Sequence, residues 1–148
     1  MRLSRKQFMI LTLAAIVTWM LWPRSLEGAF DATGPVSASV VIFDVVEGEL
    51  DTQTEQYQLE ADAPAGEKLE ELLGEYSYHL SVESLIGKDS LEGFTVAIHL
   101  YNVKGEKLTL VDETGKLSIN NMVYRLDYWG SDRSTALCED VLKILREA

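Results

Sequence analysis

Apolar and polar residues alternate most clearly between residues 94 and 101. Apolar side chains occupy every second position there, at Phe94, Val96, Ile98 and Leu100. Side chains along a strand point alternately to the two faces of a sheet, so this spacing predicts a strand with one fully apolar face. We therefore expect Ile98 to lie in the core.

Three shorter apolar runs follow that strand, each after turn-forming residues. We expect further strands over 107–111, 117–119 and 122–128. Asn120 and Asn121 join the last two, and asparagine tolerates the positive φ angles that a tight hairpin turn requires. Four strands in direct succession predict an antiparallel meander.

The chain before the meander predicts a pair of strands and a helix. Residues 36–46 are rich in β-branched residues and have apolar side chains on both alternating faces, which predicts a central strand. Residues 52–59 alternate more weakly and predict a more exposed partner strand, joined to the first through residues 47–51. A helix is expected from Asp62-Ala-Pro64 to Gly74, because proline costs no hydrogen bond in the first turn and glycine favours helix ends.

Residues 78–82 predict one more strand, and residues 83–93 predict an exposed loop. Beyond the meander, Ser131 or Asp132 is expected to cap a final helix that closes the core. The resulting order, ββαβββββα, predicts an α+β fold with a mostly antiparallel sheet and two helices packed on one face.

The N-terminal segment has a different pattern. Phe8 to Trp22 form a mostly apolar run of 15 residues, which follows three cations and precedes a strongly acidic remainder. This asymmetry predicts a transmembrane or signal helix with a cytoplasmic N-terminus. Neither candidate cleavage site, after Gly28 or after Ala29, has a small residue at the −3 position. An uncleaved single-pass anchor in the cell membrane is therefore favoured over secretion after signal cleavage.

These patterns divide the chain into three parts. We expect a membrane anchor or signal segment over 1–24, a turn-rich linker over 25–35 and an extracytoplasmic α+β domain over 36–148.

Charge narrows the choice of partners. The 148 residues carry a net charge of −11, and the part from Ser25 onward carries nine Lys and Arg residues against 24 Asp and Glu residues, a net charge of −15. A surface this anionic repels phosphate backbones, which excludes nucleic acid as a partner. Many of the acids lie between Asp44 and Glu75. A solvated anionic face is expected there, and a cation, a basic protein or a basic peptide is the alternative partner for it.

Few residues in the sequence suggest catalysis. His79 and His99 are the only histidines, and the sequence contains no HExxH, CxxC or GxSxG motif, which predicts no metal site, no cofactor and no catalytic residues. Cys138 is the one cysteine and has no histidine or cationic turn near it in the sequence, so we expect a buried apolar role for it. An enzyme would have to combine acidic side chains with His79 or His99 in a cleft.

Aromatic residues gather at two places in the sequence. Tyr76 and Tyr78 follow the predicted helix, and Tyr124, Tyr128 and Trp129 end the meander. Core packing is their expected role, with a recognition patch for a peptide or saccharide as the alternative.

The arrangement as a whole resembles a known class of bacterial proteins. A cationic start, one apolar segment, an early strand pair, the Leu-rich segment Glu67-Lys-Leu-Glu-Glu-Leu-Leu73 and a closing meander and helix resemble small membrane-anchored extracytoplasmic domains of unknown function from Gram-positive bacteria. The resemblance covers residues 36–147 and implies no catalytic residues. The sequence therefore predicts a non-catalytic, membrane-tethered interaction or sensing module. A cleaved, secreted binding or inhibitor-like protein of the same fold is the alternative.

Overall fold

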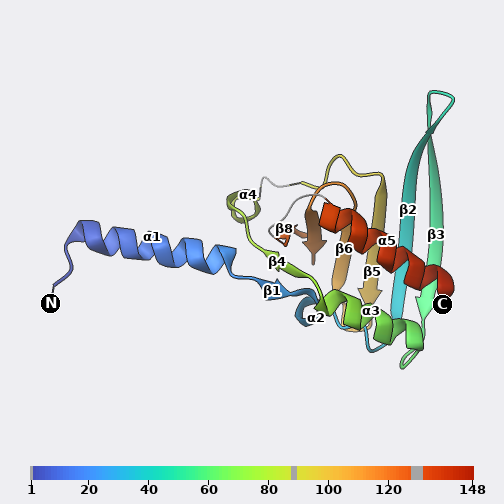
Figure 1. Ribbon diagram of the computed structural model, residues 1–148, viewed down its shortest axis with the longest axis horizontal. Coiled ribbons are helices and arrows are strands. Elements are labelled where there is room, and N and C mark those ends of the chain that lie inside the picture. Colours follow the sequence, from blue (N-terminus) through green and yellow to red (C-terminus); the bar gives the residue numbers. More distant parts are fainter. Residues whose placement is uncertain (1, 88–89, 128–131) are drawn as a thin grey trace.

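The computed structural model describes residues 2–87, 90–127 and 132–148. Across these ranges the chain forms eight strands, which make one antiparallel sheet, and five helices (Figure 1). In chain order the elements are α1 (Arg5–Leu21), β1 (Arg24–Ser25), α2 (Leu26–Ala29), β2 (Val36–Val46), β3 (Glu49–Leu59), α3 (Pro64–Gly74), β4 (Ser77–His79), α4 (Val82–Leu85), β5 (Val96–Asn102), β6 (Lys107–Val111), β7 (Lys116–Ile119), β8 (Met122–Leu126) and α5 (Asp132–Glu147). The predicted α+β class is confirmed.

The sheet has the strand order β1-β4-β8-β7-β6-β5-β2-β3. Its centre is the predicted meander, in which β5, β6, β7 and β8 are neighbours in sequence and in space. Asn120 and Asn121 have φ angles of 50° and 70° and form the two-residue turn between β7 and β8. The meander and its last turn are therefore confirmed.

Two helices, α3 and α5, lie side by side across one face of the sheet, in front of the strands in Figure 1. The apolar positions of the meander point towards them, and Ile98, Leu100 and Leu110 are almost completely buried. Leu69 and Leu73 of α3 and the apolar side of α5 fill the space between the helices and the sheet. We call this side of the sheet the helix face.

The N-terminal helix α1 has 17 residues and projects away from the sheet (Figure 1). Within the part of the chain that the structure describes, no helix combines the length and apolar character needed to span a membrane. A helix of 17 residues extends for about 26 Å, less than the roughly 30 Å of a hydrocarbon core. The predicted membrane anchor from Phe8 to Trp22, the single-pass localisation and the fold description that included a transmembrane helix are therefore wrong.

Residues 25–35, which we expected to be a linker, contribute to the folded body. Leu26, Phe30 and Ala32 have no exposed surface and belong to the main core cluster. The strand β1 pairs with β4, which adds an eighth strand to the sheet, and α2 packs on α3. The folded body therefore begins near Arg24.

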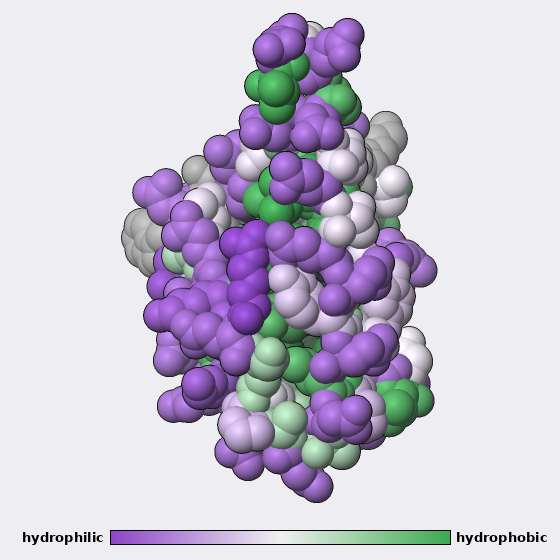
Figure 2. Space-filling view, turned by 90° about the vertical axis from the view of Figure 1, so that its right-hand side faces the viewer, coloured by the Kyte–Doolittle hydropathy of each residue, from purple (hydrophilic) through white to green (hydrophobic). Residues whose placement is uncertain are grey.

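The hairpin of β2 and β3 extends beyond the rest of the sheet (Figure 1). The pairing of β2 with β5 ends at Ile42, whereas β2 remains paired with β3 as far as Val46. Its turn is Glu47–Gly48, with φ angles of 54° and 81°, so the connection is shorter than the predicted segment 47–51. Val45 and Leu50 are each 68% exposed, and hydrophobic side chains are visible near the projecting end of the hairpin in Figure 2.

Residues 83–93, predicted as a loop, include part of the short helix α4. Ser81 caps this helix by accepting a hydrogen bond from the Ser84 backbone N–H at 3.1 Å. The last predicted helix is present as α5. Of its two expected N-caps, Asp132 is already a helical residue and Ser131 lies outside the described residues.

Candidate binding surface on the open face of the sheet

The face of the sheet opposite α3 and α5 is the open face. Directly paired residues on adjacent strands project from the same face of a sheet, so the strand register identifies its members. They are the odd-numbered residues of β2, β5 and β6, together with the residues paired with them on the neighbouring strands.

A row of polar side chains crosses five adjacent strands on this face. The register pairs Gln56 with Ser39, Ser39 with His99, His99 with Thr109, and Thr109 with Ser118. We call these five residues the polar track. Neighbouring strands are spaced by about 4.8 Å, so the track is about 19 Å long and runs perpendicular to the strands.

Hydrogen bonds connect members of the polar track to one another. The Gln56 side-chain amide donates to Ser39 Oγ at 3.1 Å, and His99 Nδ1 lies 3.1 Å from Thr109 Oγ1 in a hydrogen bond. Thr109 and Ser118 are buried although they lie on the open face. These contacts hold the polar groups in fixed positions.

A second row of side chains lies beside the polar track. It consists of Gln58, Ser37, Tyr101 and Lys107, again paired strand by strand. Ser37 Oγ donates to Gln58 Oε1 at 3.0 Å, and Lys107 Nζ lies 5.5 Å from the centre of the Tyr101 ring. Tyr101 is 43% exposed. The row therefore presents an accessible aromatic ring whose orientation is restrained by a cation–π contact.

Carboxylates are absent from the open face of the described strands. The four carboxylates of these strands lie on the helix face. Glu55, Asp51 and Glu49 pair with Val40, Asp44 and Val46, and these even-numbered residues of β2 project from that face. Glu55 forms an ion pair with Arg146 of α5 at 2.8 Å, and this contact lowers the pKa of the Glu55 carboxyl group. In a protein with 24 acidic residues, the sheet thus has one face with acidic side chains and one without them.

His99 is the titratable group at the centre of the polar track. Its partial burial, and secondarily the charge of Lys107, lower the pKa of the imidazole. The ring is therefore neutral at pH 7, and a neutral imidazole offers one hydrogen-bond donor and one acceptor.

The other end of the open face is covered by α4 and the segment after it. Lys116 Nζ donates to the Ser90 carbonyl oxygen at 3.3 Å, and the Arg125 guanidinium lies 3.5 Å from a Glu83 carboxylate oxygen. The uncovered part of the open face is accordingly centred on β3, β2 and β5, since Thr109 and Val111 of β6 are buried.

The two histidines lie on the same face but do not form one site. His79 belongs to β4, which is four strands away from the β5 strand of His99, a separation of about 19 Å. Burial, followed by the charge of Arg125, lowers the pKa of His79. The cleft that a histidine-based enzyme would require is therefore not formed by this pair.

Two other sequence-based expectations concern reactive groups. Cys138 of α5 is buried as expected, and burial raises the pKa of its thiol to about 12. Such a thiol remains protonated and is a poor nucleophile. Across residues 2–87, 90–127 and 132–148, no three or more His, Cys, Asp and Glu side chains are grouped so that they could hold a metal ion.

The aromatic residues that we expected in the core mostly pack on the helix face. Tyr76 is buried beneath the Arg133 guanidinium, and the rings of Tyr78 and Tyr124 meet edge to face with centres 5.0 Å apart. Tyr128 and Trp129 lie outside the described residues. The exposed ring on the open face is instead that of Tyr101, which the sequence placed only within a strand.

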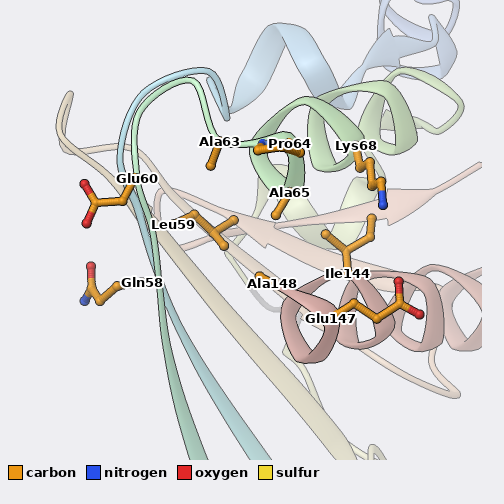
Figure 3. Close-up of a pocket in the computed structure, with 10 residues that line it drawn as sticks. All are labelled: Gln58, Leu59, Glu60, Ala63, Pro64, Ala65, Lys68, Ile144, Glu147 and Ala148. Atoms are coloured by element: carbon orange, nitrogen blue, oxygen red, sulfur yellow. The ribbon is translucent and has the colours of Figure 1, made fainter.

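A pocket of about 360 Å³ lies where the start of α3, the end of β3 and the end of α5 meet (Figure 3). Its aliphatic lining includes Leu59, Ala65 and Ile144, and Lys68 and Glu147 are exposed at its rim. Specific ligand pockets combine an apolar lining with a few fixed polar groups. The charged groups of this pocket are exposed and no hydrogen bond from the described residues holds them in place, which makes it a weaker candidate than the polar track.

The acidic side chains predicted to form an anionic face include several on the outer surface of the two helices. A groove between α3 and α5 is lined by Glu71, Glu75 and Asp140, with Lys68 and Lys143 among them. A cationic or basic partner for these acids remains a prediction.

Comparisons of the chain with protein-family models, with curated proteins and with solved structures gave no match. The resemblance to anchored domains of Gram-positive bacteria therefore remains an interpretation of the sequence pattern.

Proposed function

We propose that this chain is a non-catalytic binding module whose ligand lies on the open face of the sheet. The observation that carries the proposal is the sorting of carboxylates, which lie on the helix face of the described strands and not on the open face. A face that served only to keep the protein soluble would carry both signs of charge, whereas the open face of the described strands carries Lys107, Lys116 and Arg125 and no carboxylate.

The fixed geometry of the polar track also supports binding. Its side chains are held by hydrogen bonds and by the sheet itself, so little conformational entropy is lost when a ligand docks on them. The positions of the reactive groups support a role without catalysis, because His79 and His99 are separated and the Cys138 thiol is buried.

Nuclear magnetic resonance with the isotope-labelled full chain tests this proposal and does not require the ligand to be identified first. Three probe sets are titrated separately: neutral oligosaccharides, acidic oligosaccharides, and short peptides of mixed sequence. We expect one set to shift signals of the polar track and of the Tyr101 row, while signals of the helix face stay in place.

Two outcomes contradict the proposal. One is a set of shifts that cluster around the pocket between α3 and α5, which would move the binding site to the opposite side of the sheet. The other is the absence of any shift on the open face with all three probe sets.

A further inference from the structure

We infer that the open face binds a neutral saccharide chain, which lies along the polar track with one sugar ring against Tyr101. This inference rests on the proposed function and adds the chemical class of the ligand. Three properties of the two rows of side chains support it: their hydrogen-bonding groups, their charge and their geometry.

A ligand on the open face is recognised by side chains alone. The strands β2, β5, β6 and β7 each have a paired neighbour on both sides, so their backbone groups are occupied by the sheet. An extended peptide gains its affinity from backbone pairing at a free strand edge. The terminal strand β3 offers such an edge only at the end of the two rows, and not along them. This geometry favours a ligand that presents its own hydrogen-bonding groups along its length.

The side chains of the polar track match a polyol. Serine and threonine hydroxyls, the glutamine amide and a neutral imidazole each both donate and accept hydrogen bonds, and sugar hydroxyls do the same. Gln56, Ser39 and His99 are the members of the track that are not buried, and they lie on three adjacent strands. A row of such groups can therefore contact successive hydroxyls of one chain.

Charge decides that the saccharide is neutral. An anionic chain is repelled by a protein whose part after Arg24 carries a net charge of −15, and Lys107 is the one cation within the two rows. A cationic chain finds no carboxylate on the open face of the described strands. An uncharged ligand avoids both penalties.

Tyr101 supplies an apolar contact next to the polar track. Its ring is the 43% exposed aromatic on this face, and it is a direct neighbour of Ser37 on one side and of Lys107 on the other. The C–H groups of a sugar ring pack on an aromatic ring, and an exposed aromatic side chain with fixed orientation adds contact area at low entropic cost.

Affinity electrophoresis of the full chain tests the inference. Native gels are cast with and without one dissolved polysaccharide, and the ratio of mobilities in the two gels reports binding. The neutral probes are dextran, laminarin, galactomannan, arabinoxylan and glycol chitin, and the acidic probes are polygalacturonate and hyaluronan.

We expect at least one neutral probe to retard the protein and neither acidic probe to do so. Tyr101→Ala should then weaken binding about tenfold, whereas Tyr101→Phe, which keeps the ring, should stay within about twofold of the unmodified chain. Ser39→Val, which removes a hydroxyl from the track and leaves a β-branched strand residue, should also weaken binding about tenfold. Thermal unfolding of each variant shows whether it is folded.

The inference is overturned if no neutral probe retards the chain, if only an acidic probe does, or if folded Tyr101→Ala and Ser39→Val bind as the unmodified chain does. The magnetic resonance titration separates this failure from a failure of the proposed function. Peptide-induced shifts on the open face would leave the binding surface in place and reject only the saccharide.

Discussion

The two faces of the sheet differ in what holds their side chains in place. On the helix face, most apolar residues of the meander belong to the core beneath α3 and α5, and Ile98, Leu100 and Leu108 have no exposed surface. On the open face, several polar side chains are linked by hydrogen bonds across the sheet, and apolar residues such as Val41, Phe43 and Val111 lie beside them. Adjacent residues of one strand therefore have different roles. Residues on the helix face build the core, and residues on the open face form a surface that contributes less to stability.

The largest expected effect on stability is that of a carboxylate on the helix face of β5, compared with a carboxylate on the open face of the same strand. Ile98→Asp introduces a carboxylate with no partner into a fully buried position, and the cost of burying it exceeds the stability of a typical domain. We expect loss of the cooperative thermal transition and of the near-ultraviolet circular dichroism signal. Tyr101→Asp on the exposed face of the same strand should retain both signals. A cooperative transition in Ile98→Asp would show that the two faces are assigned incorrectly.

A truncation at neighbouring positions compares packing on the two faces. Leu100 is completely buried, and Leu100→Ala should lower the free energy of unfolding by about 2–5 kcal/mol because it leaves a cavity. Tyr101→Ala should lower it by less than about 1 kcal/mol, since Tyr101 is 43% exposed and no cavity is left in the core. Urea denaturation measures both values, and equal losses would contradict the difference between the faces.

Acidic residues contribute differently to stability according to their burial. Asp112, which follows β6, is buried and has a structural role. Asp112 is 7% exposed and accepts hydrogen bonds from the backbone N–H groups of Thr95 and Val96 and from the Thr95 hydroxyl. Asp112→Ala leaves those donors without a partner, so the free energy of unfolding should fall by about 2 kcal/mol. Glu49→Ala on the exposed hairpin is the matched control and should change it by less than about 0.5 kcal/mol. Similar values for the two variants would argue that Asp112 is not a structural residue.

Acidification should change the free energy of unfolding by a smaller amount, through the two histidines of the open face. His79 and His99 have lowered pKa values in the folded protein, so between those values and the ordinary histidine pKa the unfolded chain binds more protons. Stability therefore falls as the pH is lowered through about 6.5. We expect the free energy of unfolding to be lower at pH 5.5 than at pH 7.5, and the loss to shrink in the double variant His79→Gln, His99→Gln. An unchanged loss in that variant would assign it to other groups.

Local pattern predicted the elements whose environment is fixed by their own sequence. The alternation at 94–101 placed Ile98 and Leu100 in the core, because one face of a strand must be buried as a unit. The positive φ angles of Asn120 and Asn121 followed from side-chain chemistry alone. The burial of Cys138 likewise followed from its apolar helical surroundings.

Features that depend on distant parts of the chain could not be predicted in the same way. The polar track joins residues from five strands, and its composition depends on the register of each pair, which tertiary packing sets. The turn-like composition of residues 25–35 predicted a linker, although Leu26 and Phe30 are buried core residues. Their burial depends on α3 and the sheet, which are distant in the sequence. The charge asymmetry around Phe8 to Trp22 suggested a membrane segment, whereas the length of α1 argues against it.

Binding of a ligand on the open face is tested most directly by two substitutions in one strand. Gln56 and Gln53 are both exposed residues of β3, and the register places Gln56 on the open face and Gln53 on the helix face. Gln56→Glu and Gln53→Glu make the same chemical change and add the same charge. In affinity electrophoresis with a neutral polysaccharide that retards the unmodified chain, Gln56→Glu should lose about tenfold in affinity while Gln53→Glu stays within about twofold. Equal affinities for the two variants, or a loss confined to Gln53→Glu, would contradict binding on the open face.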